Sequence, residues 1–167
     1  SIVLLNADTY EYRVVVTQDS GCETESAGAI VTVVEDPQVV IAANDIDICQ
    51  GGTAVFTSIV TGGAGSNLYQ WQINNSGTWE DISGATSASY NVLLANLGTF
   101  EYRLVVTQDA GCESNSNGIT ITVLEDPVVA ISADQTDLCD GGVVTISSTV
   151  TGGSGTNTYQ WQINDGG

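Results

Sequence analysis

Four cysteines are the residues of this chain whose type and spacing most directly suggest chemistry. They form two sets with one spacing, since Cys22 precedes Cys112 by 90 positions and Cys49 precedes Cys139 by the same 90. Two thiols per period predict disulfide bonds, and therefore an oxidising compartment outside the cytoplasm. The simplest pairing joins Cys49 to Cys112, which closes a loop of about 60 residues and restricts the unfolded chain by roughly 4 kcal/mol.

Carboxylates recur with the same spacing as the cysteines. The chain has 20 acidic residues against two basic ones, and its formal net charge is −18. Calcium takes about six to eight oxygen ligands, so acidic residues that gather where two repeats meet predict a calcium site. The other interpretation is a solvated acidic surface that keeps an extracellular array soluble. The candidate calcium ligands are Asp36, Asp47, Asp109, Glu125 and Asp126.

Missing residue types exclude several classes of function. The chain has no histidine and no lysine, so the usual general base, the commonest metal ligand and the Schiff-base amine are absent. No nucleophile motif or phosphate-binding loop occurs, and an enzyme is therefore not expected. The negative charge disfavours nucleic acid and anionic lipid as partners. Apolar runs of about five residues are too short for insertion into a membrane.

The 90-residue spacing extends over the whole chain. Residues 11–77 and 101–167 are identical at 39 of 67 positions without a gap. A period of this length is one small domain rather than one turn of a solenoid. The chain then divides into residues 1–36, the C-terminal part of one repeat; residues 37–126, a complete repeat; and residues 127–167, the N-terminal part of the next.

Period-2 alternation predicts strands throughout the complete repeat. In residues 69–73, Tyr69, Trp71 and Ile73 share one face and two glutamines share the other, and residues 99–107 alternate in the same way. Such alternation is typical of half-buried strands. About seven short strands, with turns every 8–12 residues or so and no helical pattern, predict an all-β fold. We expect tandem antiparallel β-sandwich domains of the immunoglobulin-like type.

Aromatic residues form the predicted core of this sandwich. Trp71 takes the position of the core tryptophan of immunoglobulin domains, and Phe56 and Tyr102 stand where antibody domains have the disulfide between the sheets. Packing is thus expected to join the sheets instead. Phe100 stands at the tyrosine-corner position without the hydroxyl group, which Tyr10 supplies in the preceding repeat.

The same topology favours a second cysteine pairing. It places the turns that carry Cys49 and Cys112 at opposite ends of the domain, farther apart than the roughly 4.4–6.8 Å between Cα atoms that a disulfide allows. Domains stacked head to tail would instead let each of the four cysteines bridge to a neighbouring repeat: Cys22, Cys49, Cys112 and Cys139. Both pairings stay open at this level, as do free thiols.

Incomplete repeats at both ends fit two arrangements. The first is a stretch of a longer continuous polypeptide. In the second, residues 127–167 of one copy and 1–36 of another jointly complete a sandwich, without a counterpart of residues 78–90, and chains polymerise by strand complementation. Neighbouring repeats, in the same chain or in identical chains, are the expected partners in both arrangements.

Two kinds of exposed side chain remain. Arg13 and Arg103 are the same position of successive repeats, and each is expected to form an ion pair with a carboxylate on the sheet surface. Trp79 is expected to pack at the edge of the sheet. If Trp79 or Tyr90 were instead exposed in an aromatic strip, the chain would be a carbohydrate-binding or accessory module of a secreted enzyme, which is the alternative function.

An ordered set of motifs resembles a known family. The set comprises Cys49-x-Gly-Gly, Thr61-Gly-Gly, Tyr69-Gln-Trp-Gln, the run from Trp79 to Tyr90, Glu101-Tyr-Arg and Gly111-Cys. It is similar to the tandem immunoglobulin-like or PKD-like repeats of giant secreted cell-surface proteins of Bacteroidota, of the adhesin and gliding type. The resemblance implies a β-sandwich, an extracellular location and a role as stalk or adhesive filament, and it names no ligand.

These observations together predict a structural protein. Repeats joined through Leu124-Glu125-Asp126-Pro127 have no glycine or serine spacer, and proline restricts both its own backbone and that of the residue before it. We therefore expect a short, semi-rigid linker. The predicted function is the repeat unit of an extracellular fibre or stalk, which serves as spacer and mechanical scaffold for adhesion or filament formation.

Overall fold

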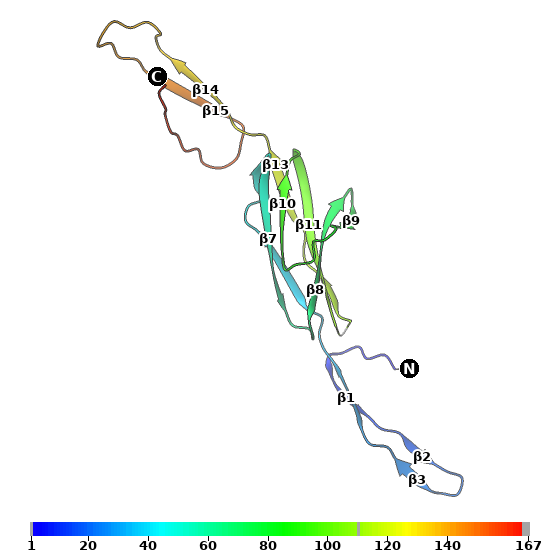
Figure 1. Ribbon diagram of the computed structural model, residues 1–167. Helices are drawn as coiled ribbons and strands as arrows, with labels where there is room; N and C mark the ends of the chain where they lie inside the picture. Colours follow the sequence, from blue (N-terminus) through cyan, green and yellow to red (C-terminus); the bar gives the residue numbers. More distant parts are fainter. Residues whose placement is uncertain (1, 110, 165–167) are drawn as a thin grey trace.

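The computed structural model describes residues 2–109 and 111–164, which form an elongated succession of strands (Figure 1). These residues form fifteen strands and no helix. Within this described part, no helix is therefore long and apolar enough to span a bilayer. A complete domain occupies the middle of the chain, and strand pairs extend from its two opposite ends (Figure 1).

Two sheets build the central domain. One has the order β10-β7-β5, and the other has the order β6-β13-β11-β8-β9, with β12 paired to the end of β11. The predicted all-β fold of sandwich domains is confirmed. The strands are β5 (Gln38–Ala43), β6 (Asp47–Cys49), β7 (Gly52–Thr61), β8 (Asn67–Asn75), β9 (Thr78–Asp81), β10 (Ser89–Leu94), β11 (Gly98–Gln108), β12 (Glu113–Asn115) and β13 (Ile119–Leu124).

One strand pair differs from the predicted antiparallel pattern. β6 pairs with β13 in parallel, with Ile48 opposite Val123. The chain reaches this position because β5 pairs with β7 in the first sheet and the segment after β5 then crosses to the second. β6 thus runs alongside the last strand of the domain in the same direction. A three-residue strand is too short for an alternation pattern, which is why the sequence did not indicate it.

Alternation along β11 explains the core. Tyr102, Leu104 and Val106 are buried, and they face β7, where Ala54 and Phe56 are also buried. Because successive side chains of a strand point to opposite faces, the residues between them lie on the outer face. β11 pairs with β8 on one side and β13 on the other, so it is the central strand of its sheet.

In the flanking repeats, the strands pair as the corresponding strands of the central domain do. These repeats contain β1 (Asp8–Tyr12), β2 (Val15–Thr17), β3 (Glu23–Glu25) and β4 (Ala29–Val33) before it, and β14 (Val128–Ala133) and β15 (Ile146–Thr151) after it. Tyr10 lies opposite Val31, as Phe100 lies opposite Ile121. Position by position, β14 and β15 repeat the register of β5 and β7. The register is therefore a property of the repeat sequence itself.

Candidate functional sites at the ends of the domain

An aromatic cluster lies at the centre of the core of the central domain. The ring of Phe56 lies 4.9 Å from that of Tyr102 and 5.4 Å from that of Trp71, measured between centroids. Trp71 donates its indole N–H to the carbonyl of Ser87 over 2.9 Å. Phe56, Trp71 and Tyr102 are fully buried, so the two sheets are joined by packing at the place where antibody domains have a disulfide.

Two further aromatic positions were singled out by the sequence. Phe100 is half-buried and packs against the core. Tyr10, its counterpart, donates its hydroxyl to the carbonyl of Asn6 over 3.1 Å, which is the hydrogen bond of a tyrosine corner. Burial raises the pKa of Tyr102 to about 12, and the nearby Tyr90 adds to the rise. The phenol of Tyr102 thus stays neutral well into the alkaline range.

A buried amide organises the N-terminal end of the domain. Gln108, at the end of β11, is nearly fully buried. Its Oε1 accepts the N–H of Ala64 over 2.8 Å, and its Nε2 donates to Oδ1 of Asn67 over 2.8 Å. Gly63 has a φ of +69°, and a Cβ there would overlap the amide of Gln108. The Thr-Gly-Gly loop is therefore held directly against the strand end.

Pro37 ties the incoming chain to this same end. Its ring is fully buried in the domain, although it stands at the start of the repeat. The backbone of Asp36 lies beside Gly62 of the loop. Asp109 accepts the N–H of Ser66 over 3.0 Å, which fixes the turn after β11 to the loop. The last residues of the linker are thus part of the folded domain.

Consecutive backbone carbonyls anchor the outgoing chain at the C-terminal end. The carbonyl of Leu124 accepts the N–H of Gln50, in the central domain, over 2.9 Å. The carbonyl of the next residue, Glu125, accepts the N–H of Gly153, in the following repeat, over 3.1 Å. The ring of Pro127 also lies within contact distance of Gly153. The carbonyl that is hydrogen-bonded within the central repeat and the carbonyl that is hydrogen-bonded to the following repeat thus belong to adjacent residues.

The cysteines occupy opposite ends of the sandwich. Cys49 lies opposite Leu124 at the C-terminal end, whereas the carbonyl of Cys112 accepts the N–H of Gln108 at the N-terminal end. The 11 residues of β11 run between these ends, a span of about 33 Å at roughly 3.3 Å per residue. The disulfide Cys49–Cys112 within one domain is thus a wrong prediction for this fold. Cys22, Cys49, Cys112 and Cys139 are all free thiols in the structure.

The predicted calcium ligands are distributed over both ends. Asp36 and Asp109 lie at the N-terminal end, and Glu125 and Asp126 follow β13 at the other. Asp47 lies in β6, opposite Thr122. Within the described ranges, no three acidic or cysteine side chains gather closely enough to hold a metal ion. Calcium at the junctions stays a prediction from the sequence.

The two arginines differ in their partners. Arg13 forms an exposed ion pair with Glu25 over 2.6 Å. Arg103 instead donates to Oε1 of Gln72 over 2.7 Å and stacks over the ring of Trp79 at 4.4 Å. The reason lies in the sequence, because Asn115 stands where the preceding repeat has Glu25. The expected ion pair thus occurs for one arginine only among the described residues.

The aromatic residues of the alternative function do not share a surface. Arg103 covers one face of Trp79, which is half-buried. Tyr90 packs inward against Phe56 and Trp71, with centroids 6.3 Å and 6.0 Å away. Trp79 therefore packs at the sheet edge, and the pair forms no aromatic strip of the kind that a sugar-binding groove needs.

The comparison with known families settles the classification. A family model described as Domain of unknown function (DUF8696) matches residues 39–125. The chain belongs to this family. The DUF8696 match runs from the first strand of the central sandwich to Glu125, so it covers almost the whole complete repeat. No curated protein matches the chain in sequence.

Several solved structures are similar to this DUF8696 chain. They include fibronectin(III)-like modules of Clostridium thermocellum CbhA (16% identity, TM-score 0.41, 73% of this chain and 65% of that one) and an amphioxus IgVJ-C2 molecule (13%, 0.41, 70% and 60%). The N-terminal four Ig domains of Dscam1 isoform 8.4 follow (17%, 0.35, 70% and 27%). The chain spans less than two thirds of the length of each.

Sequence reasoning missed the features that matter most at the ends of the DUF8696 domain. It did not single out Gln108 or the buried Pro37, and it gave the Thr-Gly-Gly loop no role. A signal was present, because Gln108 recurs as Gln18 and Gly63 as Gly153. A glutamine that repeats at the inward positions of an apolar strand indicates a buried amide with fixed partners.

Proposed function

We propose that this chain is the structural repeat of an extracellular surface fibre or stalk, in which DUF8696 domains act as spacer and mechanical scaffold. The observation that carries the proposal is the anchoring of Leu124 and Glu125. Their consecutive carbonyls are hydrogen-bonded to two different repeats, so the junction lacks the slack of a flexible linker. Repeats joined in this way add length in a fixed direction, which suits a stalk.

Further observations agree with this role. No buried side-chain nitrogen or oxygen of the described residues is left without a hydrogen-bond partner. The aromatic core joins the sheets over their inner faces. A location outside the cell agrees with the strongly acidic, lysine-free composition and with two cysteines per period. The motif resemblance to Bacteroidota surface repeats points in the same direction.

Small-angle X-ray scattering on arrays of one, two and three complete repeats tests the mechanical part. For a rod, the maximum dimension grows by about 35–40 Å with every repeat, as expected from strands of about ten residues and their linker. A flexible string would grow with roughly the square root of the repeat number. The matched control inserts Gly-Gly-Ser between Leu124 and Glu125, which separates the two hydrogen-bonded carbonyls. The maximum dimension of this variant should grow as that of a flexible string and not as that of a rod.

Location is tested separately. Antibodies against the central domain should label intact cells of the producing organism, and added protease should remove the label. Labelling only after permeabilisation would contradict an extracellular role. The scattering result would stand in that case, so the two parts of the proposal fail independently.

A further inference from the structure

We infer that a second copy of the chain binds side by side to the first, through the outer face of the sheet β10-β7-β5 in each complete repeat. The inference rests on the proposed function, in which repeats form a rod, and it adds a lateral partner for that rod. The strands of this sheet run along the length of the domain (Figure 1). Their outer face therefore lies between the two ends that join successive repeats, and end-to-end stacking leaves it open.

Charge is distributed unequally between the two sheets of the central domain. None of the residues of β5, β7 and β10 is charged. The charged residues of the complete repeat lie on the other sheet, in connecting segments and in the linker: Asp45, Asp47, Glu80, Asp81, Glu101, Arg103, Asp109, Glu113, Glu125 and Asp126. Two such acidic repeats can therefore meet through the outer face of β10-β7-β5 without bringing carboxylates together.

Aliphatic side chains are exposed on this uncharged face. Val40 is 63% exposed, Ile59 is 69% exposed and Leu93 is 67% exposed. Val40 lies directly opposite Ile59 on the neighbouring strand, so these two side chains form one apolar pair. Their position follows from alternation, because the apolar residues next to them in the chain pack against the core. Exposed apolar residues that share one face mark an interaction site.

The residue types of the face favour a second sheet as the partner. Its centre is a row of small side chains, in which Thr57 lies opposite Ala42 on one side and opposite Ser89 on the other. The aromatic residues of these strands, Phe56 and Tyr90, point into the core, so they are not available for stacking on a sugar. Small and β-branched side chains form the surfaces through which sheets pack face to face, about 10 Å apart. The same face of a second copy is such a surface.

The outer face of the other sheet is different, because its polar side chains bind one another. Arg103 donates to Gln72, and Gln72 donates to Oδ1 of Asp81 over 2.7 Å. Asn74 donates to a carboxylate oxygen of Glu101 over 2.6 Å. Docking of a second copy on this face would have to desolvate these charged groups. The uncharged face is therefore the side of the domain that a second copy covers at the lower cost.

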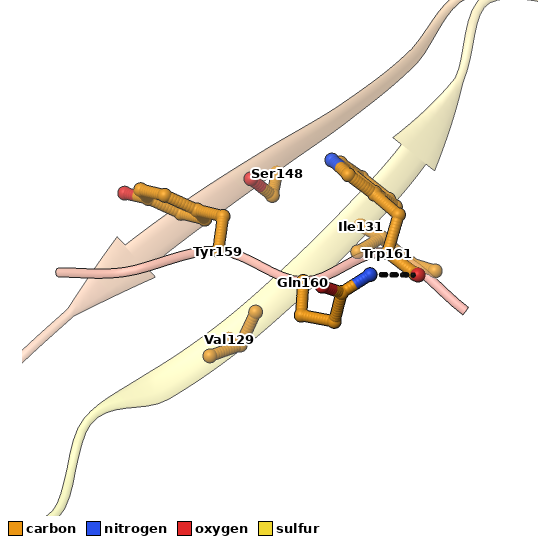
Figure 2. A pocket seen from close by; sticks show the side chains of 6 residues that line it. All are labelled: Val129, Ile131, Ser148, Tyr159, Gln160 and Trp161. Carbon is orange, nitrogen blue, oxygen red and sulfur yellow. Dashed lines mark hydrogen bonds between the residues drawn. The ribbon is translucent and has the colours of Figure 1, made fainter.

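The lack of charge continues into the following repeat. β14 and β15, which correspond to β5 and β7, carry no charged residue. Figure 2 shows Val129 and Ile131 of β14 on the side of Tyr159 and Trp161. Because successive side chains of a strand alternate, Ala130 lies on the opposite, outer face. The uncharged outer face is thus a property of the repeat sequence, and successive repeats offer it to a partner.

The size of the face predicts how association depends on the number of repeats. Three strands about 4.8 Å apart and about six residues long cover about 300 Å² on each partner. Two such faces bury roughly 600 Å², which is less than the roughly 1,200 Å² of a stable interface. One repeat should therefore stay monomeric, whereas several repeats in one array add their contacts. Two identical arrays can keep the faces together because every junction has the same geometry.

Sedimentation velocity of arrays with one, two and three complete repeats tests the inference. All strands of both sheets lie within residues 38–124, so whole repeats can be joined. The single repeat should stay monomeric, and the array of three should dimerise at least tenfold more tightly than the array of two. Salt should strengthen the association, because both partners are acidic.

Two results would overturn the inference. Arrays of three repeats that stay monomeric at high salt would leave the face to a partner other than a second copy. A single repeat that dimerises as tightly as three would show that the contact is not the small lateral face. The rod dimensions of dilute arrays would be unaffected in both cases, so these failures can be told apart from a failure of the proposed function.

Two leucines provide a matched pair of variants. Leu93 lies on the uncharged face, whereas Leu68 lies on the outer face of the other sheet and is exposed to nearly the same extent, 64%. Leu93→Asp in every repeat should weaken dimerisation of the three-repeat array at least tenfold, and Leu68→Asp should leave it nearly unchanged. Equal losses would indicate unspecific hydrophobic association, which contradicts the inference. Circular dichroism checks that both variants stay folded.

Cross-linking tests the face-to-face geometry. Thr57 lies in the middle of β7, the central strand of the face, so a two-fold contact places Thr57 of one copy opposite Thr57 of the other. Thr57→Cys arrays treated with a short bismaleimide should therefore be linked through residue 57 of two chains, as peptide mapping detects. Thr120→Cys, which is exposed on the other sheet, is the matched control and should give no such link. Equal linking at the two positions would overturn the inference.

Discussion

Gly63 and the side chain of Gln108 share one confined space at the N-terminal end of the central domain. The glycine backbone takes a φ of +69°, and a Cβ at this position would overlap the amide of Gln108. The amide has little freedom to move, because it forms hydrogen bonds with both Ala64 and Asn67. The loop that meets the incoming linker is thus shaped by one glycine and one buried glutamine.

Gly63→Ala should therefore destabilise the domain by about 2–4 kcal/mol, since backbone strain and the displacement of a buried amide add together. Gly77→Ala is the matched control. Gly77 has a φ of +93° with no atom near its missing Cβ, so only backbone strain of about 1–2 kcal/mol is expected. Urea unfolding followed by tryptophan fluorescence measures both. Equal losses at the two positions would contradict the role of Gln108.

Alkaline pH should destabilise the central domain through Tyr102. The folded domain holds the Tyr102 proton to a pKa of about 12, against an ordinary value of 10.0. Between these values the unfolded chain binds fewer protons than the folded one, so stability falls as the pH rises. The loss should approach about 2–3 kcal/mol near pH 12 by the usual conversion.

Tyr102→Phe provides the control for this pH dependence. The variant keeps the ring beside Phe56 and removes the ionisable group, so its stability should change much less between pH 10 and 12. Urea unfolding at a series of pH values measures the difference. Parallel curves for the wild type and the variant would assign the alkaline loss to other groups.

The stacking of Arg103 on Trp79 should contribute measurably to stability. The guanidinium carbon lies 4.4 Å from the ring centroid, a geometry worth about 0.5–1 kcal/mol at an exposed site. A double-mutant cycle with Arg103→Gln and Trp79→Leu isolates this coupling. A coupling energy near zero would mean that the two side chains lie together without stabilising each other.

Peptide mapping by mass spectrometry without reduction should find no link between Cys49 and Cys112 of one chain, because they lie at opposite ends of β11. Links that do form should join cysteines of neighbouring repeats, because the ends of successive domains meet at the junctions. A Cys49–Cys112 link within a chain would contradict the placement of the two ends.

The sequence was sufficient for the longer strands and the core, because alternation and large aromatic residues are local signals. Trp71, Phe56 and Tyr102 are core positions wherever this pattern folds into a sandwich. The ion pair expected for Arg103 does not form, because Asn115 stands where the preceding repeat has an acidic residue. A comparison of the two repeats at that position would have shown it.

The junction could not be predicted in the same way. The anchors of Leu124 and Glu125 are backbone carbonyls, whose partners depend on how distant loops fold and not on side-chain type. The parallel pairing of β6 is likewise set by where the chain crosses between sheets. The sequence indicated a stiff linker through Pro127, but it did not indicate the backbone carbonyls that hold this linker, because every residue type has such a carbonyl.

Two consecutive carbonyls that belong to different domains also restrict torsion. The following repeat is thereby held at one angle about the long axis relative to the central repeat, since the carbonyls of Leu124 and Glu125 are hydrogen-bonded to different repeats. In an array of identical junctions this angle accumulates by a constant step. Any chemical group on one face, such as the stacked Arg103 and Trp79, would then trace a regular helix around the fibre, with a pitch determined by the junction alone.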